Sequence, residues 1–165
     1  LGSGDVKGEE LQGSLILRTT SGDVQLSRVY GALEMALTSG DVQGRDVKGS
    51  VRVKTGSGDV FLDGFHGDLD VSTGSGDVDV EGSMDEGGEW RIRTGSGDVS
   101  LKVPKDLGLA VDLVSSSGDV VCTLPVSAQR MEEGRVQGTL GQEPKGSLRV
   151  ATGSGDIHVQ QSGDL

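Results

Sequence analysis

The sequence predicts an all-β fold, a single-domain parallel β-solenoid (β-helix) of about eight flattened coils, each with two strands and 18–21 residues. Three observations support this prediction. A Ser-Gly-Asp motif recurs eight times, apolar residues alternate with polar ones on both sides of it, and glycine recurs at a second position in most repeats. A sequence period near 20 residues is typical of solenoids, in which each repeat stacks on the next.

The repeated motif ends in an aspartate, and successive aspartates are 18, 18, 18, 18, 21, 21 and 37 residues apart. Because the motif is rich in glycine, we expect it at a tight turn, called the tip below. A second glycine, ten residues before most of the aspartates, predicts the opposite turn of each coil. The tip aspartates are Asp5, Asp23, Asp41, Asp59, Asp77, Asp98, Asp119 and Asp156.

Each repeat contains two short runs in which every second residue is apolar. Around the fourth tip, Val51 and Val53 come before the motif, and Val60 and Leu62 come after it. A spacing of two places side chains on one face of a β-strand, so we expect one strand on each side of the tip. A helix is excluded because the period is two and glycine interrupts every run.

A column of charged residues lies at an outward position, seven residues before each aspartate. From Glu34 onward the sign of the charge alternates at every repeat, and opposite charges on neighbouring strands contribute ~0.2–1 kcal/mol. We interpret the column as a charge ladder that helps to fix the register; the alternative is a solvated face of mixed charge. In chain order the column reads Ile16, Glu34, Arg52, Asp70, Arg91, Asp112 and Arg149.

The 37-residue step between Asp119 and Asp156 is one coil too long, and the surplus lies at about residues 122–146. This segment fits a protruding loop, a hairpin or a degenerate coil. We prefer a loop insertion because Val136 and Leu140 lack the spacing of a full repeat. Such a loop is either a functional element or a tolerated insertion.

Composition excludes several classes of protein. The 165-residue chain has 15 basic and 26 acidic residues, a net charge of −11, whereas nucleic acids and anionic membranes attract basic surfaces. No apolar run approaches the ~18 residues that cross a bilayer, so we expect no direct membrane insertion by this segment. The single cysteine, Cys122, excludes an internal disulfide.

Stacked tips would place neighbouring carboxylates about 4.8 Å apart, where they repel each other. The column must therefore be exposed, capped by hydrogen-bond donors or neutralised by cations. We prefer capping by backbone N–H groups of the tip and by serine hydroxyls. Calcium is the alternative, although one aspartate per coil supplies few of the roughly six to eight oxygens that calcium takes. That metal column would be Asp5, Asp23, Asp41, Asp59, Asp77, Asp98 and Asp119.

No constellation of catalytic residues is present, so we expect no enzyme, no catalytic residue and no cofactor. His66 and His158 are isolated and are expected at surface turns or strands. Cys122 and Trp90 fall on inward columns and are expected in the core. The acids form a periodic column without a cleft-forming aromatic platform, which argues against a polysaccharide-cleaving enzyme.

The sequence Thr-Gly-Ser-Gly-Asp-Val, repeated at residues 55–60, 73–78 and 94–99 between alternating strands, resembles the bacterial putative-adhesin family of β-strand-repeat domains of unknown function. The resemblance covers residues 13–159. It implies a β-solenoid in an envelope-associated or extracellular protein, and it brings no catalytic residue with it.

The function expected on these grounds is non-enzymatic: a rigid β-solenoid that serves as a structural or interaction module of an envelope-associated adhesin or scaffold. The alternative is a calcium- or glycan-binding module that uses the aspartate column or residues 122–146. An envelope protein, a glycan or a second copy of this chain is the expected partner. End-to-end stacking is expected because the sequence opens at a turn and closes at the start of a new coil, without caps.

Overall fold

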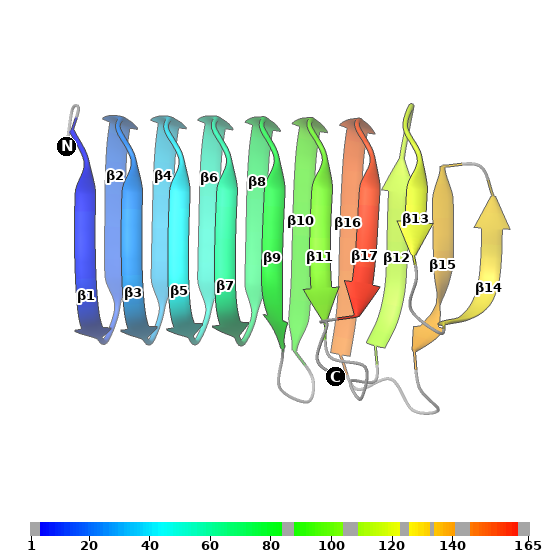
Figure 1. Ribbon diagram of the computed structural model, residues 1–165, viewed down its shortest axis with the longest axis horizontal. Coiled ribbons are helices and arrows are strands. Elements are labelled where there is room, and N and C mark those ends of the chain that lie inside the picture. Colours follow the sequence, from blue (N-terminus) through cyan, green and yellow to red (C-terminus); the bar gives the residue numbers. More distant parts are fainter. Residues whose placement is uncertain are drawn as a thin grey trace.

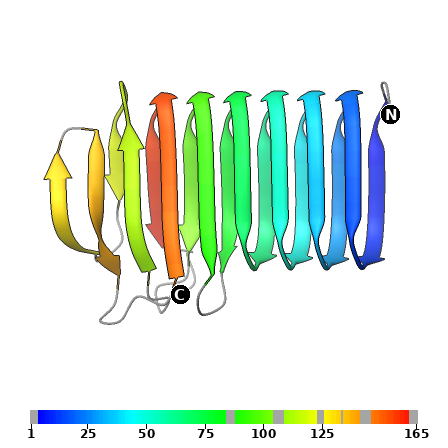
Figure 2. The ribbon, with the colours of Figure 1, turned by 180° about the vertical axis from the view of Figure 1, so that it is seen from behind.

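The computed structural model describes residues 4–83, 88–103, 109–122, 126–132, 134–140 and 146–161. All helical or extended structure in these ranges is β-strand, in two facing sheets that form an elongated rod (Figure 1). From β1 to β13 the chain passes from one sheet to the other between consecutive strands, and Figure 2 shows the rod from behind. The prediction of an all-β parallel β-solenoid is confirmed.

Among the described residues one sheet has eight strands and the other has nine. The spatial order of the eight-stranded sheet is β1 (Val6–Gln12), β3 (Val24–Tyr30), β5 (Val42–Lys48), β7 (Val60–His66), β9 (Val78–Ser83), β11 (Val99–Val103), β17 (Ile157–Gln161) and β13 (Val120–Cys122). The order of the nine-stranded sheet is β14 (Val126–Glu132), β15 (Arg135–Leu140), β12 (Leu109–Ser115), β16 (Gly146–Ser154), β10 (Glu89–Ser96), β8 (Leu69–Ser75), β6 (Val51–Ser57), β4 (Leu33–Ser39) and β2 (Leu15–Ser21).

The core lies between the sheets and is built from inward columns of identical or similar residues. Val51 pairs with Leu69, and every coil-to-coil pair of the regular part keeps this parallel register. Trp90 is fully buried, as predicted, and its indole Nε1 donates a hydrogen bond to the carbonyl oxygen of Gly67 at 2.8 Å. Its ring centroid lies 5.7 Å from that of Phe65, so two aromatic residues fill one layer of the core.

Stacked glycines build the tips. Gly58 and Gly76 have φ of 137° and 140°, a conformation that L side chains rarely adopt. A Cβ on Gly76 would overlap the carbonyl oxygen of Gly58 in the neighbouring coil. The absence of a side chain lets the backbones approach, and the Gly58 N–H donates to the carbonyl of Ser75 at 3.1 Å.

An extra residue interrupts the alternation in the first four strands of the eight-stranded sheet, a feature that the sequence analysis missed. Glu10, Arg28 and Asp46 have φ of 52–54°, and Gly64 has φ of 70°. Such non-glycine residues are uncommon, and an extra residue of this kind shifts the inward face by one position. The residues that face the core after this shift are Leu11, Val29, Val47 and Phe65.

The coils do not stack entirely in chain order. Five coils, from β2–β3 to β10–β11, follow one another, but the C-terminal coil β16–β17 comes next, between β10–β11 and β12–β13 (Figure 1). Trp90 pairs with Leu148, and Leu148 pairs with Val111. The assumption that successive tips in the chain are neighbours is therefore wrong at Asp98 and Asp119, because Asp156 lies between them.

Residues 126–140 contain a β-hairpin rather than a loop alone, so the loop prediction for about 122–146 is wrong for these strands. β15 pairs antiparallel with β12, and β14 pairs antiparallel with β15. Two strands thereby extend the nine-stranded sheet beyond the last coil (Figure 2). Because β15 occupies the free edge of β12, a second copy of the chain cannot pair with β12 there.

Candidate binding face

The tip aspartates form a hydrogen-bonded ladder along one edge of the rod. Asp59 Oδ1 accepts the backbone N–H of Asp77 at 2.9 Å, and Asp77 Oδ1 accepts that of Asp98 at 2.9 Å. The same bond, at 2.8–3.1 Å, joins the other neighbouring tips. Capping by backbone N–H groups is thus observed, but the donor belongs to the next coil. In spatial order the ladder is Asp5, Asp23, Asp41, Asp59, Asp77, Asp98, Asp156 and Asp119.

The aspartate ladder reduces the number of carboxylate oxygens that are free to bind calcium, but it does not test the calcium hypothesis. One oxygen of each accepting carboxylate already accepts a hydrogen bond from the N–H of the neighbouring tip. In addition, Asp156 lies between Asp98 and Asp119, so the seven aspartates of the predicted calcium column are not all neighbours. Within the described ranges no three His, Cys, Asp or Glu side chains are grouped so that they could hold a metal ion. The calcium column remains a prediction.

Buried hydroxyls support the tips from inside. Thr55 and Thr73 are about 5% exposed, and their Oγ1 atoms donate to the carbonyls of Ser57 and Ser75 at 3.2 and 3.3 Å. Each hydroxyl therefore satisfies a carbonyl at the turn and finds its own partner, as a buried polar group must. The tips are therefore hydrogen-bonded both to the coil's own hydroxyl and to the neighbouring tip.

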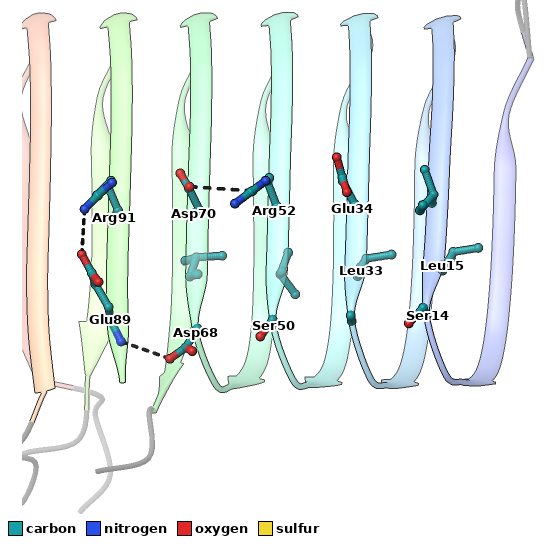
Figure 3. A pocket seen from close by; sticks show the side chains of 14 residues that line it. Ser14, Leu15, Leu33, Glu34, Ser50, Arg52, Asp68, Asp70, Glu89 and Arg91 are labelled. Atoms are coloured by element: carbon teal, nitrogen blue, oxygen red, sulfur yellow. Dashed lines mark hydrogen bonds and ion pairs between the residues drawn. The ribbon is translucent and has the colours of Figure 1, made fainter. Parts of the chain in front are cut away.

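The predicted charge ladder is only partly correct. Glu34, Arg52, Asp70 and Arg91 occupy neighbouring strands in this order (Figure 3), and Arg52 Nε lies 3.9 Å from Asp70 Oδ2. Beyond them the alternation fails, because Arg91 is paired with Arg149 and only then does Asp112 follow.

Arg91 and Asp112, at the place where the alternation fails, find partners elsewhere. Arg91 Nη2 contacts Glu89 Oε1 of its own strand at 2.9 Å, and Arg135 Nε of the hairpin lies 3.6 Å from Asp112 Oδ1. The coil order already places Arg149 next to Asp112, and Arg135 of the hairpin adds a second counter-charge.

A groove of about 490 Å³ runs across β2, β4, β6, β8 and β10 on the outer face of the nine-stranded sheet (Figure 3). Its lining combines the charge ladder with polar residues closer to the glycine turn, such as Ser50 and Asp68. Ile16, at the end of the groove, is 66% exposed. The groove is long and shallow, and apolar atoms and charged side chains share its lining. Because it crosses five strands, it suits an extended partner rather than a compact molecule.

A second groove of about 540 Å³ lies beside the first on the same face, closer to the tips. Arg18 and Lys54 line it together with small and hydroxylic side chains. Sequence analysis considered neither groove, because only the alignment of whole columns across strands shows them.

The two histidines and the cysteine considered in the sequence do not lie together in one site. His158 is exposed on β17, His66 is half-buried at the end of β7, and neither is in a described metal-ligand cluster. Cys122 faces the core but is only partly buried, because its strand β13 is the last of the eight-stranded sheet. In the described part of the chain, no helix has the length and apolar character to cross a membrane.

Comparisons with known proteins agree with this fold. The sequence model of Toastrack DUF4097 matches residues 1–160. A crystal structure of a "putative cell adhesion protein" from Clostridium sporogenes ATCC 15579 is similar with a TM-score of 0.51 and 14% identity, over 97% of this chain and 93% of that chain. At that identity the likeness shows the fold alone. No curated protein matches the sequence.

Proposed function

This chain belongs to the Toastrack DUF4097 family, and from that premise we propose that it is a non-enzymatic interaction module, the rigid β-solenoid of an envelope-associated adhesin or scaffold. The name of the structural neighbour, "putative cell adhesion protein", supports the interpretation as an adhesin.

The observation that carries the proposal is the continuous core of the rod together with the regular register of its faces. One hydrophobic cluster runs through the coils, and the tip ladder adds a hydrogen bond between each pair of neighbouring tips. A solenoid of this kind holds its side chains in straight columns at a fixed spacing of about 4.8 Å. Such columns suit the recognition of an extended partner, and repeat proteins bind through their long faces.

Retention of an envelope component tests the proposal. The folded domain is immobilised on beads and incubated with envelopes prepared from the source cells, with unfolded domain on matched beads as the control. We expect saturable retention of a component that is released with its mass unchanged. Absence of retention, or a chemical change in the retained component, would contradict a non-enzymatic interaction module.

A further inference from the structure

The outer face of the nine-stranded sheet is basic, although the protein as a whole has a net charge of −11. Among the described residues seven basic and five acidic side chains lie on this face. The strands alternate inward and outward positions, and the columns follow from the pairing of the strands. The basic residues are Arg18, Arg52, Lys54, Arg91, Arg93, Arg135 and Arg149, and the acidic residues are Glu34, Asp68, Asp70, Glu89 and Asp112.

The excess positive charge is concentrated in one column, five residues before each tip aspartate. The charges of the neighbouring ladder largely compensate one another, whereas this column contains no acid. In the described structure Lys54 and Arg93 form no ion pair. We call the column the basic row; it comprises, in spatial order, Arg18, Ala36, Lys54, Ser72, Arg93, Ala151 and Val114.

Cations and small residues alternate along the basic row from Arg18 to Ala151. Because neighbouring coils are about 4.8 Å apart, its cations are about 10 Å apart. Nucleic acid presents charges far more densely, at about 3.4 Å along one strand. A sugar ring in an extended polysaccharide is about as long as one coil is high. The row therefore matches a linear polysaccharide with one acidic group on every second sugar.

The groove over the basic row has room for such a chain. Ala36 and Ser72 lie between the long cationic side chains and leave space over their strands, while Thr20 and Thr38 add exposed hydroxyls along one side. Hydroxyls donate and accept hydrogen bonds, as sugar hydroxyls do. No aromatic ring lines this groove, so binding would depend on charge and hydrogen bonds rather than on stacking.

We propose that the basic row binds a linear acidic polysaccharide that carries one carboxylate per disaccharide. This inference rests on the proposed function and names the class of its partner. The tip aspartates repel such a ligand only weakly, because each lies in the turn beyond the strand end, which is three residues or roughly 10 Å from the row. That distance is greater than the screening length of about 8 Å at physiological salt.

Binding of a hyaluronate oligosaccharide long enough to span the row tests the inference. Its affinity is measured near physiological salt for the unchanged protein and for a row variant that combines Arg18→Gln, Lys54→Gln and Arg93→Gln. A control variant combines Lys7→Gln, Arg45→Gln and Lys102→Gln on the eight-stranded sheet, which removes the same charge from the opposite face.

We expect saturable binding that weakens about tenfold or more in the row variant and changes less than about threefold in the control. Carboxyl-reduced hyaluronate should bind weakly, and binding should fall as salt rises. Equal affinities of the two variants would overturn the inference, as would absent binding or tighter binding of polyphosphate or single-stranded DNA. If the row variant fails to fold, Lys54→Gln alone is compared with Arg45→Gln.

The bead experiment separates this inference from the proposed function. Beads that carry the row variant should retain much less of the envelope component than beads that carry the unchanged protein. Equal retention on both would overturn the polysaccharide inference and leave the interaction module standing. Failure of untreated envelopes to be retained would instead contradict the proposed function.

Discussion

At the scale of single residues, the tip aspartate affects stability in two ways, through its hydrogen bonds and through its charge. Its side chain accepts the N–H of the next tip, and its own N–H donates to the tip before it, so each aspartate links three coils. The exposed carboxylates also repel one another at their spacing of about 4.8 Å, by under about 1 kcal/mol per pair in full contact with water. The hydrogen bond and the charge therefore act in opposite directions.

Substitution of Asp59 separates these two effects. In Asp59→Ala the N–H of Asp77 loses its acceptor, and we expect the free energy of unfolding to fall by about 1 kcal/mol. Asp59→Asn keeps an oxygen acceptor and removes the charge, so its stability should equal or exceed that of the unchanged protein at low salt. Urea unfolding at two salt concentrations measures both. Equal losses in the two variants would show that the charge, rather than the hydrogen bond, stabilises the tip.

At the scale of the element, the strands of the nine-stranded sheet combine inward columns that are apolar in nearly every coil with outward columns whose charge differs between coils. The apolar inward columns contribute most of the packing between coils, and they do not distinguish one neighbouring coil from another. The outward columns supply charge contacts such as that between Arg52 and Asp70. Surface ion pairs of this kind contribute little individually, so their effect is best measured by reversing a charge.

Asp70→Arg would place three arginines in a row, at position 70 and at its neighbours Arg52 and Arg91. We expect a loss of about 1 kcal/mol in the free energy of unfolding, and a smaller loss at high salt, because screening weakens the repulsion. The measurement is chemical denaturation across salt concentrations.

Asp63→Arg is the matched control for this reversal. It changes the net charge equally, but its neighbours are Arg45 and Glu81, whose effects oppose each other. Identical behaviour of the two variants at every salt concentration would exclude a stabilising charge ladder.

At the scale of the whole molecule, each coil contacts only its neighbours, as in other solenoids. The C-terminal coil is the neighbour of both β10–β11 and β12–β13. It therefore connects the regular part of the rod to the far end, where the hairpin lies (Figure 1).

A chain that ends at residue 145 lacks β16 and β17 and tests this connection. We expect fast amide hydrogen exchange at residues 109–140, because β12 and β13 lose the strands that they pair with, while residues 33–80 stay protected. Hydrogen exchange with mass spectrometry compares the two chains. Continued protection of residues 109–122 would mean that this coil stacks directly on β10–β11.

The strands and their inward faces were predictable from the sequence, because a period of two and the repeated tip set them locally. The burial of Trp90 was predicted correctly for this reason. The extra residue at Arg28 was missed, although Leu26 and Val29, both inward, are three residues apart and thereby signal it. The coil order was not predictable, because the inward residues Leu148 and Val111 fit the same column equally well. The grooves depend on that order and on columns read across strands, so they too required the structure.

The position of the C-terminal coil also decides when the far end of the rod can form. A ribosome makes residues 109–140 before residues 146–161, yet β12 and β13 pair with β16 and β17. The first coils can assemble one after another as they emerge, whereas β12–β13 must wait for a later segment to be inserted beneath it. During synthesis the nascent chain thus passes through a stage in which β10–β11 presents an open edge, and residues 146–161, made after residues 109–140, are the ones that close it.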